Sequence, residues 1–357
     1  MRKLTRVAKI GAVEIGGSNP IAIQSMTNTD TRDVLATVRQ IEALAAAGCE
    51  IVRLAVPDDA AALAFGEIRK RVSDKIPLVA DIHFDWRLAV KSAEAGADKL
   101  RINPGNIGGI EKVKEVARAA KERKIPIRIG VNSGSLEKEL LAKHGGPTPL
   151  ALAESALAHA AMLESCGFYD IVISIKASSV PTCIEACKIL SEKTDYPQHI
   201  GITESGTAKR GAIKSAVGIG ALLAQGIGDT IRVSLTADPV EEVAVAREIL
   251  MSLALRSFGV EFVSCPTCGR TEIDLMKLAL IVEEKCKSIS APLKVAVMGC
   301  VVNGPGEARD ADIGVAGGKG KGAIFKKGKI LRTVDEPDLA SALLLEIEKL
   351  AAEAGGR

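Results

Sequence analysis

Three cysteines and one glutamate near the end of the chain have the types and spacing of metal ligands. Cys265 and Cys268 form a C-P-T-C turn, which lets two sulfurs converge on one metal centre. Cys300 lies in the stretch G-C-V-V-N-G-P-G-E, where glycines and a proline favour a tight loop. Because a closed zinc site or a cubane cluster needs four ligands, Glu307 of the same loop is the expected fourth ligand. The sequence therefore predicts a metal centre, which could hold zinc or an iron–sulfur cluster.

The other cysteines lie in apolar stretches and are expected to pack in the interior as small hydrophobic residues. They are Cys49, Cys166, Cys183, Cys187 and Cys286. The chain contains no apolar run of the roughly 18 residues that a membrane-spanning helix needs, and its basic start lacks the apolar core of a signal peptide. We therefore expect a cytoplasmic protein whose thiols stay reduced.

The elements that position candidate residues alternate regularly over about the first 240 residues. Apolar strands are predicted at 20–26, 49–56, 77–84, 99–105, 126–134, 170–177, 199–205 and 230–235, and each is followed by a helical pattern. Strict β–α alternation implies a parallel sheet, and eight strands are the number that closes a TIM (β/α)8 barrel. A predicted hairpin at 7–17 is expected to plug the bottom of this barrel.

Polar side chains recur near the ends of these predicted strands. They are Ser25, Arg53, Asp81, Arg101, Arg128, Lys176, Glu204 and Arg232. In a TIM barrel the carboxyl ends of the strands meet at one mouth, where active sites are built. Any one of these charges could belong to a core ion pair, but four of the basic residues in one mouth, Arg53, Arg101, Arg128 and Lys176, would repel each other without an anion. We therefore predict a polyanionic substrate that carries a diphosphate.

Histidines add one candidate to this mouth. Asp81 and His83 lie two residues apart in a predicted strand, so they share a side of it and could be acid–base groups, substrate ligands or a structural pair. We expect His199, at the start of a predicted strand, to lie in the core or at the bottom of the barrel. His144 and His159 are expected at the surface, in a loop and on a helix.

Composition and motifs exclude several other functions. The formal net charge of +3 and the 3% aromatic content do not suit a protein built to bind nucleic acid. The phosphate-binding motifs G-x-x-x-x-G-K-[ST] and G-x-G-x-x-G are both absent. We therefore expect a small-molecule substrate, with no nucleic-acid or membrane partner.

A second, smaller α/β domain is predicted after Gly259, where the strand–helix repeat ends. We place the barrel domain at 1–258 and the metal-binding domain at 259–357. Between Ala316 and Val334 the chain has six basic residues and no acidic one. This stretch is interpreted as a solvated hairpin or as a docking face for an acidic electron carrier.

Taken together, these motifs resemble the 4-hydroxy-3-methylbut-2-enyl diphosphate synthase family of iron–sulfur enzymes. The resemblance covers essentially the whole chain, and its most specific pieces are VEFVSCPTCGRTEIDL, VMGCVVNGPGEARDADIGVAGG, RINPGNIG, RIGVNSGSLE and GITESG. It implies a TIM barrel that binds the substrate, followed by a domain that carries a [4Fe-4S] cluster. The cluster ligands that it implies are Cys265, Cys268, Cys300 and Glu307.

The resemblance also implies a reaction and its residues. The family's substrate contacts fall on Arg53, Arg101, Arg128, Asn132, Lys176 and Arg232, with Asp81, His83, Ser205 and Ser234 nearby. Glu204 matches the acid beside the breaking bond. The implied reaction is the two-electron reductive ring opening of 2-C-methyl-D-erythritol 2,4-cyclodiphosphate, which yields 4-hydroxy-3-methylbut-2-enyl diphosphate and water, with flavodoxin or ferredoxin as electron donor.

The short linker between the two predicted domains leaves little freedom for the small domain to reach its own barrel mouth. In the family, a head-to-tail homodimer places each cluster over the other subunit's barrel, and we expect the same here. A rival interpretation is a zinc-stabilised binding protein: a barrel for a phosphorylated ligand, resembling pterin-binding barrels, with a small metal domain for partner contacts. This interpretation accounts for the C-P-T-C turn. It does not explain why the loop with Cys300 and Glu307 occurs in the same chain as a barrel mouth rich in basic residues.

Overall fold

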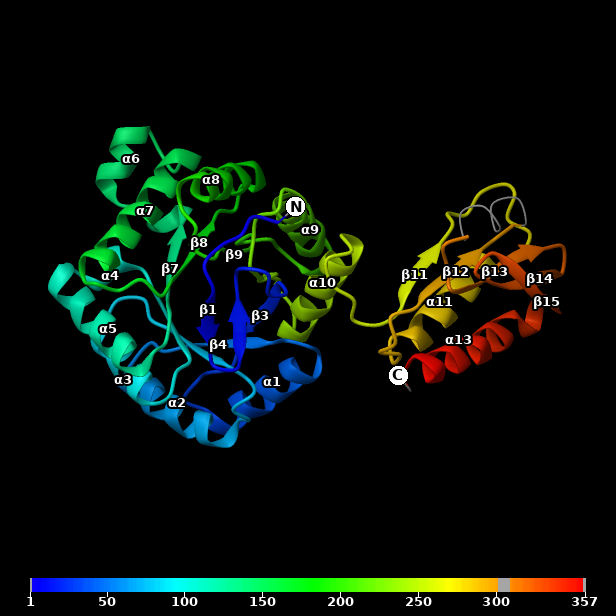
Figure 1. Ribbon diagram of the computed structural model, residues 1–357, viewed down its shortest axis with the longest axis horizontal. Coiled ribbons are helices and arrows are strands. Elements are labelled where there is room, and N and C mark those ends of the chain that lie inside the picture. The colour runs from blue at the N-terminus through cyan, green and yellow to red at the C-terminus, as the bar shows by residue number, and fades with distance from the viewer. Residues whose placement is uncertain (1, 301–308, 356–357) are drawn as a thin grey trace. The chain divides into compact units, whose positions relative to one another are not determined.

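The structure is a computed structural model that describes residues 2–300 and 309–355 (Figure 1). The chain divides into two compact units, Met1–Leu253 and Ala254–Arg357. The first unit contains the predicted strand–helix repeat, and the second contains a separate sheet with its own helices. None of the helices in the described residues is long and apolar enough to cross a membrane.

Parallel strands form a nearly closed barrel in the first unit. They are β3 (Ala22–Met26), β4 (Ile51–Ala55), β5 (Leu78–Asp81), β6 (Lys99–Ile102), β7 (Ile127–Asn132), β8 (Ile171–Lys176), β9 (His199–Ile200) and β10 (Thr230–Ile231). They pair in the order β8-β7-β6-β5-β4-β3-β10-β9. A parallel bridge between Ile173 of β8 and Gln198 brings the two ends of this sheet together. The predicted TIM barrel is thus confirmed.

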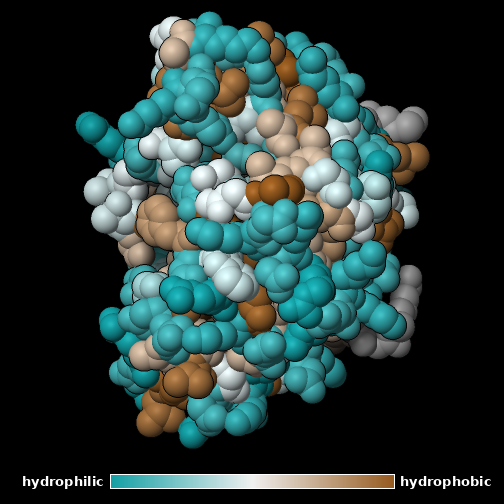
Figure 2. Space-filling view, turned by 90° about the vertical axis from the view of Figure 1, so that its left-hand side faces the viewer, coloured by the Kyte–Doolittle hydropathy of each residue, from teal (hydrophilic) through white to brown (hydrophobic). Residues whose placement is uncertain are grey.

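Helices cover the outside of this barrel (Figure 1). They are α1 (Val34–Ala46), α2 (Asp59–Arg71), α3 (Trp86–Glu94), α4 (Pro104–Ile107), α5 (Ile110–Arg123), α6 (Lys138–His144), α7 (Pro149–Ser165), α8 (Val180–Lys193), α9 (Ala208–Ala224) and α10 (Pro239–Ser252). The side chains of Asp33, Asp58 and Asp85 accept hydrogen bonds from backbone N–H groups in the first turns of α1, α2 and α3, which fixes where these helices begin. The face of the molecule in Figure 2 is mostly hydrophilic, with hydrophobic residues in small separate areas.

The amino-terminal hairpin closes the bottom of the barrel, as predicted. Strands β1 (Ala8–Ile10) and β2 (Val13–Ile15) pair antiparallel. Their side chains pack in one buried apolar cluster with residues from the amino-terminal parts of four barrel strands, namely Ala22, Ile51, Val79 and Val172. Because side chains on one face of a strand recur every second residue, the next inward positions are Gln24, Arg53, Asp81 and Ser174. The barrel interior therefore changes from apolar to polar directly above the hairpin.

The second unit is a five-stranded sheet with helices packed against it. Its elements are β11 (Glu261–Ser264), α11 (Leu275–Cys286), β12 (Lys294–Met298), β13 (Ile313–Gly318), β14 (Lys321–Lys326), β15 (Lys329–Asp335) and α13 (Leu339–Gly355). The strands lie in sequence order, with β11, β12 and β13 parallel and β14 and β15 antiparallel. Val282 of α11 and Leu343 of α13 are fully buried in one apolar cluster with Val297 and Val315 of the sheet. The predicted smaller α/β domain is confirmed.

Candidate active site

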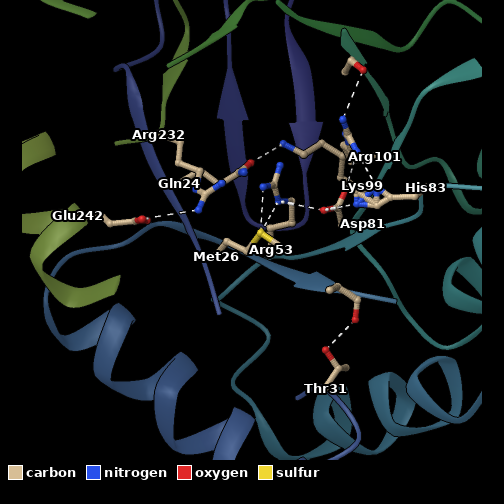
Figure 3. A network of polar contacts seen from close by, with 12 residues as sticks. Gln24, Met26, Thr31, Arg53, Asp81, His83, Lys99, Arg101, Arg232 and Glu242 are labelled. Carbon is tan, nitrogen blue, oxygen red and sulfur yellow. Dashed lines mark hydrogen bonds and ion pairs between the residues drawn. The ribbon is translucent and has the colours of Figure 1, made fainter. Parts of the chain in front are cut away.

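Three predicted site residues form an ion-pair network inside the barrel (Figure 3). Asp81 ends β5 and pairs in register with Arg101 of β6, and Arg53 lies on the neighbouring strand β4, in register with Val79. Arg101 Nη1 donates to Asp81 Oδ1 at 3.2 Å, and Arg53 Nε lies 3.6 Å from Asp81 Oδ2. His83 Nε2 lies 3.6 Å from the same Oδ2 atom, so the predicted proximity of Asp81 and His83 is present. One carboxylate thus orients two guanidinium groups.

The electrostatics of this network keep Asp81 ionised. Burial alone would raise the pKa of Asp81, but the positive charges of Arg53, Arg101 and Arg128 outweigh it and lower that pKa to about 2. Burial lowers the pKa of Arg53 to about 10, although Asp81 acts in the opposite direction. Burial also lowers the pKa of His83, against the influence of Asp81. The network therefore presents guanidinium groups and a neutral imidazole near pH 7.

Two further predicted cations lie in the interior, with no counter-ion in contact among residues 2–300 and 309–355. Arg128 is 1% exposed, and its Nε and Nη1 atoms have no hydrogen-bond partner among the described residues. Lys176 is 7% exposed, and its Nζ atom also lacks a partner within the described part of the chain. Burial first, and then neighbouring cations, lower the pKa of both groups. Buried donors without acceptors are costly, so this arrangement favours an anionic ligand.

Glycine makes room for one of these cations. A Cβ atom at Gly201 would lie 2.9 Å from Lys176 Nζ and 2.4 Å from the carbonyl oxygen of Arg232. Gly201 lies two residues after His199, so a side chain at Gly201 would point to the same side of the strand as that of His199. The absence of a side chain there lets the Lys176 ammonium group extend into the barrel.

The other predicted contacts lie at the end of β7 or in the segments after β9 and β10. Asn132, at the end of β7, pairs in register with Lys176. Arg232 is partly buried, and its Nη2 atom lies 3.6 Å from Glu242 Oε1. Ser234 is partly buried. The hydroxyl of Ser205 is buried, donates to the carbonyl oxygen of Ile202 at 3.2 Å and accepts from Ser215 at 3.3 Å.

Glu204 differs from these residues in both exposure and backbone. Its side chain is exposed, and no ion pair joins it to the network among the described residues. Its backbone has a φ of 51°, in the left-handed region that non-glycine residues seldom adopt. Backbone of this kind occurs at functional sites, and Lys124, Ala254 and Lys327 also have positive φ values.

Three interior residues, Gln24, Lys99 and Glu242, were not predicted from the sequence. Lys99 is fully buried, and its Nζ atom donates to Gln24 Oε1 at 3.2 Å. Glu242 of α10 accepts from Ser25 Oγ at 2.9 Å and from the Leu235 N–H at 3.0 Å. Lys99 lies two residues before Arg101 on β6, so the period of the strand could have indicated that both face inward. No local signal separates Glu242 from an exposed acid in the first turn of a helix.

The structure corrects two expectations about the histidines. His144 was expected in a surface loop, but it is the last residue of α6, and its side chain is 12% exposed and lies 2.8 Å from Glu154. His159 was expected at the surface but is 4% exposed, and its Nε2 atom lies 2.7 Å from Glu137 Oε1. His199 is fully buried, as expected, and its Nδ1 atom lies 2.7 Å from Thr230 Oγ1.

In the second unit, two of the predicted metal-ligating cysteines follow adjacent parallel strands. Cys265 comes directly after β11, and Cys300 comes two residues after β12, at the same edge of the sheet. The Gly299 N–H donates to Cys265 Sγ at 3.1 Å, and the Glu272 N–H donates to the Gly299 carbonyl oxygen at 3.1 Å. The loop after Cys268 is therefore tied to the backbone beside Cys300.

The donor chemistry of this edge suits an iron–sulfur group. All three cysteines are free thiols, and backbone N–H donors to sulfur are a feature that tunes iron–sulfur centres. A hydrogen bond from the Arg270 backbone lowers the pKa of Cys268, which favours its thiolate. Within residues 2–300 and 309–355, no three His, Cys, Asp or Glu side chains are already grouped tightly enough to hold a metal ion. Glu307 lies outside the described residues, so the ligand set remains a prediction.

The remaining cysteines occupy the positions of packing residues. Cys49, Cys183, Cys187 and Cys286 are buried, and Cys166 is partly buried. Burial raises the pKa of Cys49 to about 12 and that of Cys286 to about 11, so both stay protonated and unreactive near pH 7.

Comparison with known proteins agrees with both units. Residues 5–247 match the model of the GcpE TIM-barrel domain, and residues 261–349 match that of the GcpE protein C-terminal domain. The chain belongs to the GcpE family. This GcpE chain is 64% identical, over 99% of its length and 99% of the relative, to a protein of Caldanaerobacter subterraneus subsp. tengcongensis named 4-hydroxy-3-methylbut-2-en-1-yl diphosphate synthase (flavodoxin). The family predicted from the sequence is confirmed.

Solved structures resemble the GcpE barrel in fold alone. N-acetylneuraminic acid synthetase of Leptospira borgpetersenii serovar Hardjo-bovis matches with a TM-score of 0.53 at 13% identity, covering 71% of this chain and 92% of that one. Dihydropteroate synthase of Yersinia pestis matches with a TM-score of 0.50 at 12% identity, covering 70% of this chain and 98% of that one. At identities this low, the similarity shows a shared barrel fold and nothing about the ligand. It therefore gives no specific support to the rival interpretation as a pterin-like binding barrel.

Proposed function

We propose that this GcpE-family chain catalyses the reductive ring opening of 2-C-methyl-D-erythritol 2,4-cyclodiphosphate. The products are 4-hydroxy-3-methylbut-2-enyl diphosphate and water, and the reaction consumes two electrons and one proton. The observation that carries this proposal is in the barrel interior, where Arg128 and Lys176 have buried donor atoms without acceptors in the described part of the chain. The chain is also 64% identical to a protein named as a synthase of this product.

The cations of the barrel would bind the diphosphate. Asp81 already orients Arg53 and Arg101. Their remaining N–H groups can therefore donate to phosphate oxygens without a rearrangement of either side chain. Arg128 and Lys176 have free buried donors that phosphate oxygens would satisfy. Asn132 ends β7, and Arg232 and Ser234 follow β10; these residues would complete the contacts, with His83 and Ser205 nearby. Residues 1–258 thus form the substrate-binding domain.

The second domain, residues 259–357, would hold a [4Fe-4S] cluster on Cys265, Cys268, Cys300 and Glu307. When bound, such a cluster supplies electrons one at a time, which suits cleavage of a C–O bond. The exposed Glu204 would donate the proton to the departing oxygen as water forms. Its strained backbone is consistent with a carboxylate held where the reaction needs it.

Several partners follow from this assignment. The relative's name specifies flavodoxin, so we expect a flavodoxin, or the functionally similar ferredoxin, as electron donor. We also expect a cytoplasmic homodimer in which each cluster domain serves the barrel of the partner. No nucleic acid or membrane is part of the proposed reaction.

The test is metal analysis of anaerobically purified protein, followed by turnover of the cyclodiphosphate with a reductant. Iron, sulfide and a broad absorbance near 400 nm, together with release of the product, are the expected results. Zinc without this absorbance would favour the binding-protein interpretation. Cys265→Ser, Cys268→Ser and Cys300→Ser should each lose iron and activity, whereas Cys286→Ala, in the same unit, should keep both.

Glu307 calls for a separate variant. A carboxylate is a harder and more exchangeable iron ligand than a thiolate, so a substrate oxygen could replace it. The variant Glu307→Cys should therefore keep its cluster absorbance but lose turnover and the substrate-induced change in the cluster spectrum. Full turnover with an unchanged spectral response would contradict an exchangeable carboxylate.

A further inference from the structure

A buried polar cluster lies beside the loops that follow β6 and β7. Glu137 is the N-cap residue of α6, and Ser155 and His159 lie four residues apart on one face of α7. His159 Nε2 lies 2.7 Å from Glu137 Oε1, and Ser155 Oγ donates to the same oxygen at 3.2 Å. The side chain of His159 is 5% exposed and that of Glu137 is 29% exposed. One carboxylate oxygen therefore joins α6 to α7 through two hydrogen-bonding side chains.

The backbone of Gly105 packs directly against this cluster. A Cβ atom at Gly105 would lie 3.0 Å from both Glu137 Oε1 and His159 Nε2. Gly105 lies in α4, and its N–H donates to the side chain of Asn103 at 3.1 Å. Because Asn103 follows β6 by one residue, the loop that leaves the Arg101 strand rests on the Glu137–His159 pair.

The same pair fixes the loop that leaves β7. That strand ends at Asn132, and only four residues separate it from Glu137. Ser135 Oγ donates to the Asn132 carbonyl oxygen at 3.3 Å, and Leu136 is buried, so the short loop is held at both ends. A shift of Glu137 would therefore be transmitted to Asn132.

The protonation state of the pair suits a fixed contact. Burial lowers the pKa of His159, although Glu137 acts in the opposite direction. A neutral imidazole with its proton on Nε2 donates to the Glu137 carboxylate, and this single directional bond sets the ring orientation. None of the residues in this cluster belongs to the predicted substrate contacts.

We infer that Glu137 and His159 are positioning residues of the active site, which hold the loops after β6 and β7 so that Arg101 and Asn132 meet the diphosphate in the right geometry. This inference rests on the proposed function, because the diphosphate substrate is what the two loops would bind. A positioning role acts on substrate affinity, since misplacing binding groups by about 1 Å can cost up to about 100-fold.

The test compares two substitutions of one residue in the cluster-containing enzyme. His159→Gln keeps an N–H donor within reach of Glu137, whereas His159→Leu keeps similar bulk and removes the donor. The dissociation constant of the cyclodiphosphate is measured by calorimetry without reductant, so that no turnover occurs. We expect His159→Leu to weaken binding at least about tenfold, with a matching rise in KM and kcat within about twofold, and His159→Gln to stay within about threefold of the wild type.

A matched control separates positioning from stability. Tyr196→Phe removes a hydrogen bond to Glu164 of 2.8 Å that involves a buried tyrosine in the same unit, outside the predicted contacts. It should lower the denaturation midpoint without changing the dissociation constant. If His159→Leu leaves the dissociation constant unchanged, or if Tyr196→Phe weakens binding equally, the positioning role is wrong. Failure of the wild-type enzyme to bind or convert the cyclodiphosphate would instead overturn the proposed function.

Discussion

Arg101 occupies the space that a side chain at Gly130 would need. A Cβ atom at Gly130 would lie 2.4 Å from Arg101 Nε and 2.7 Å from Arg101 Nη2. Gly130 is two residues after Arg128 on β7, so it faces the barrel interior, and its carbonyl oxygen accepts from Arg101 Nη2 at 3.4 Å. The position of the guanidinium group over Asp81 therefore depends on glycine in the neighbouring strand.

The first prediction uses this contact. Gly130→Ala should displace the Arg101 guanidinium from Asp81 and weaken cyclodiphosphate binding at least about tenfold, because a bidentate phosphate donor is moved. Calorimetry without reductant measures the change. Gly220→Ala, inside α9, is the control, since a Cβ atom there would meet nothing within 4 Å. Equal affinity of the two variants would show that Arg101 does not depend on Gly130.

The second prediction concerns acid stability and Asp81. The folded-state pKa of about 2 lies below the ordinary value of 3.8, so the ionised carboxylate stabilises the fold above about pH 4. This contribution, about 2 kcal/mol, should be lost as the pH falls from about 4 to about 2. Asp81→Asn should therefore be less stable than the wild type at pH 7, and the difference in free energy of unfolding should shrink below pH 4.

Denaturant unfolding of both chains at each pH measures this difference, so that the response of other carboxylates cancels. Asp74→Asn, at a fully exposed side chain, is the control and should change little at any pH. A difference between wild type and Asp81→Asn that stays constant down to pH 2 would contradict the depressed pKa of Asp81.

The barrel and most of its mouth could be predicted because both depend on short periods in the sequence. Apolar strands that alternate with helices indicate the barrel. Inward positions recur every second residue of a strand, so Arg53, Asp81 and Arg101 could be predicted to share the barrel interior. Lys99 follows the same period, but it lies at the start of its strand, away from the carboxyl end where a site residue is expected. Its pairing with Gln24 joins β6 to β3 and depends on the closed barrel.

The buried His159 and Glu242 could not be recognised for a different reason. Helix α7 has small or apolar residues on nearly every side, so its sequence does not indicate which side faces the barrel. Glu242 lies in the first turn of α10, where acidic residues are common because they interact favourably with the helix dipole. Both side chains find their partners in other segments of the chain, and such contacts leave no local pattern.

The third prediction concerns the cost of burying Lys99. Its Nζ atom contacts a neutral amide oxygen, and burial followed by the charges of Arg128 and Arg53 lowers its pKa far below the ordinary value. Lys99→Met has similar bulk without the charge and should raise the free energy of unfolding at pH 7 by about 1 kcal/mol or more.

The pH dependence of this gain has a definite sign. A lysine whose pKa is lower in the folded state than in the unfolded state destabilises the fold at any pH below the unfolded-state pKa, which is about 10.4. The stability advantage of Lys99→Met should therefore shrink as the pH rises toward about 10. Denaturant unfolding at pH 7 and pH 10 measures it, with Lys75→Met at an exposed position as control. A loss of stability at pH 7 would show that the contact with Gln24 outweighs the cost of burial.

The fourth prediction addresses how the two domains combine. If each cluster domain serves the barrel of its partner, a mixed dimer of Glu204→Ala and Cys300→Ala chains contains one complete site, formed by the barrel of the second chain and the cluster of the first. Random mixing of two inactive variants should then restore about a quarter of the wild-type activity, because about half of the dimers are mixed and each has one of two sites.

The control for this experiment mixes Glu204→Ala with a chain that carries both substitutions. No arrangement of that pair contains an intact Glu204, so it should stay inactive. If Glu204→Ala and Cys300→Ala chains form mixed dimers, shown by two different affinity tags, and activity still does not recover, each cluster must serve the barrel of its own chain. In that case the linker after the barrel would have to let the second domain reach the mouth formed by Arg53 and Arg101.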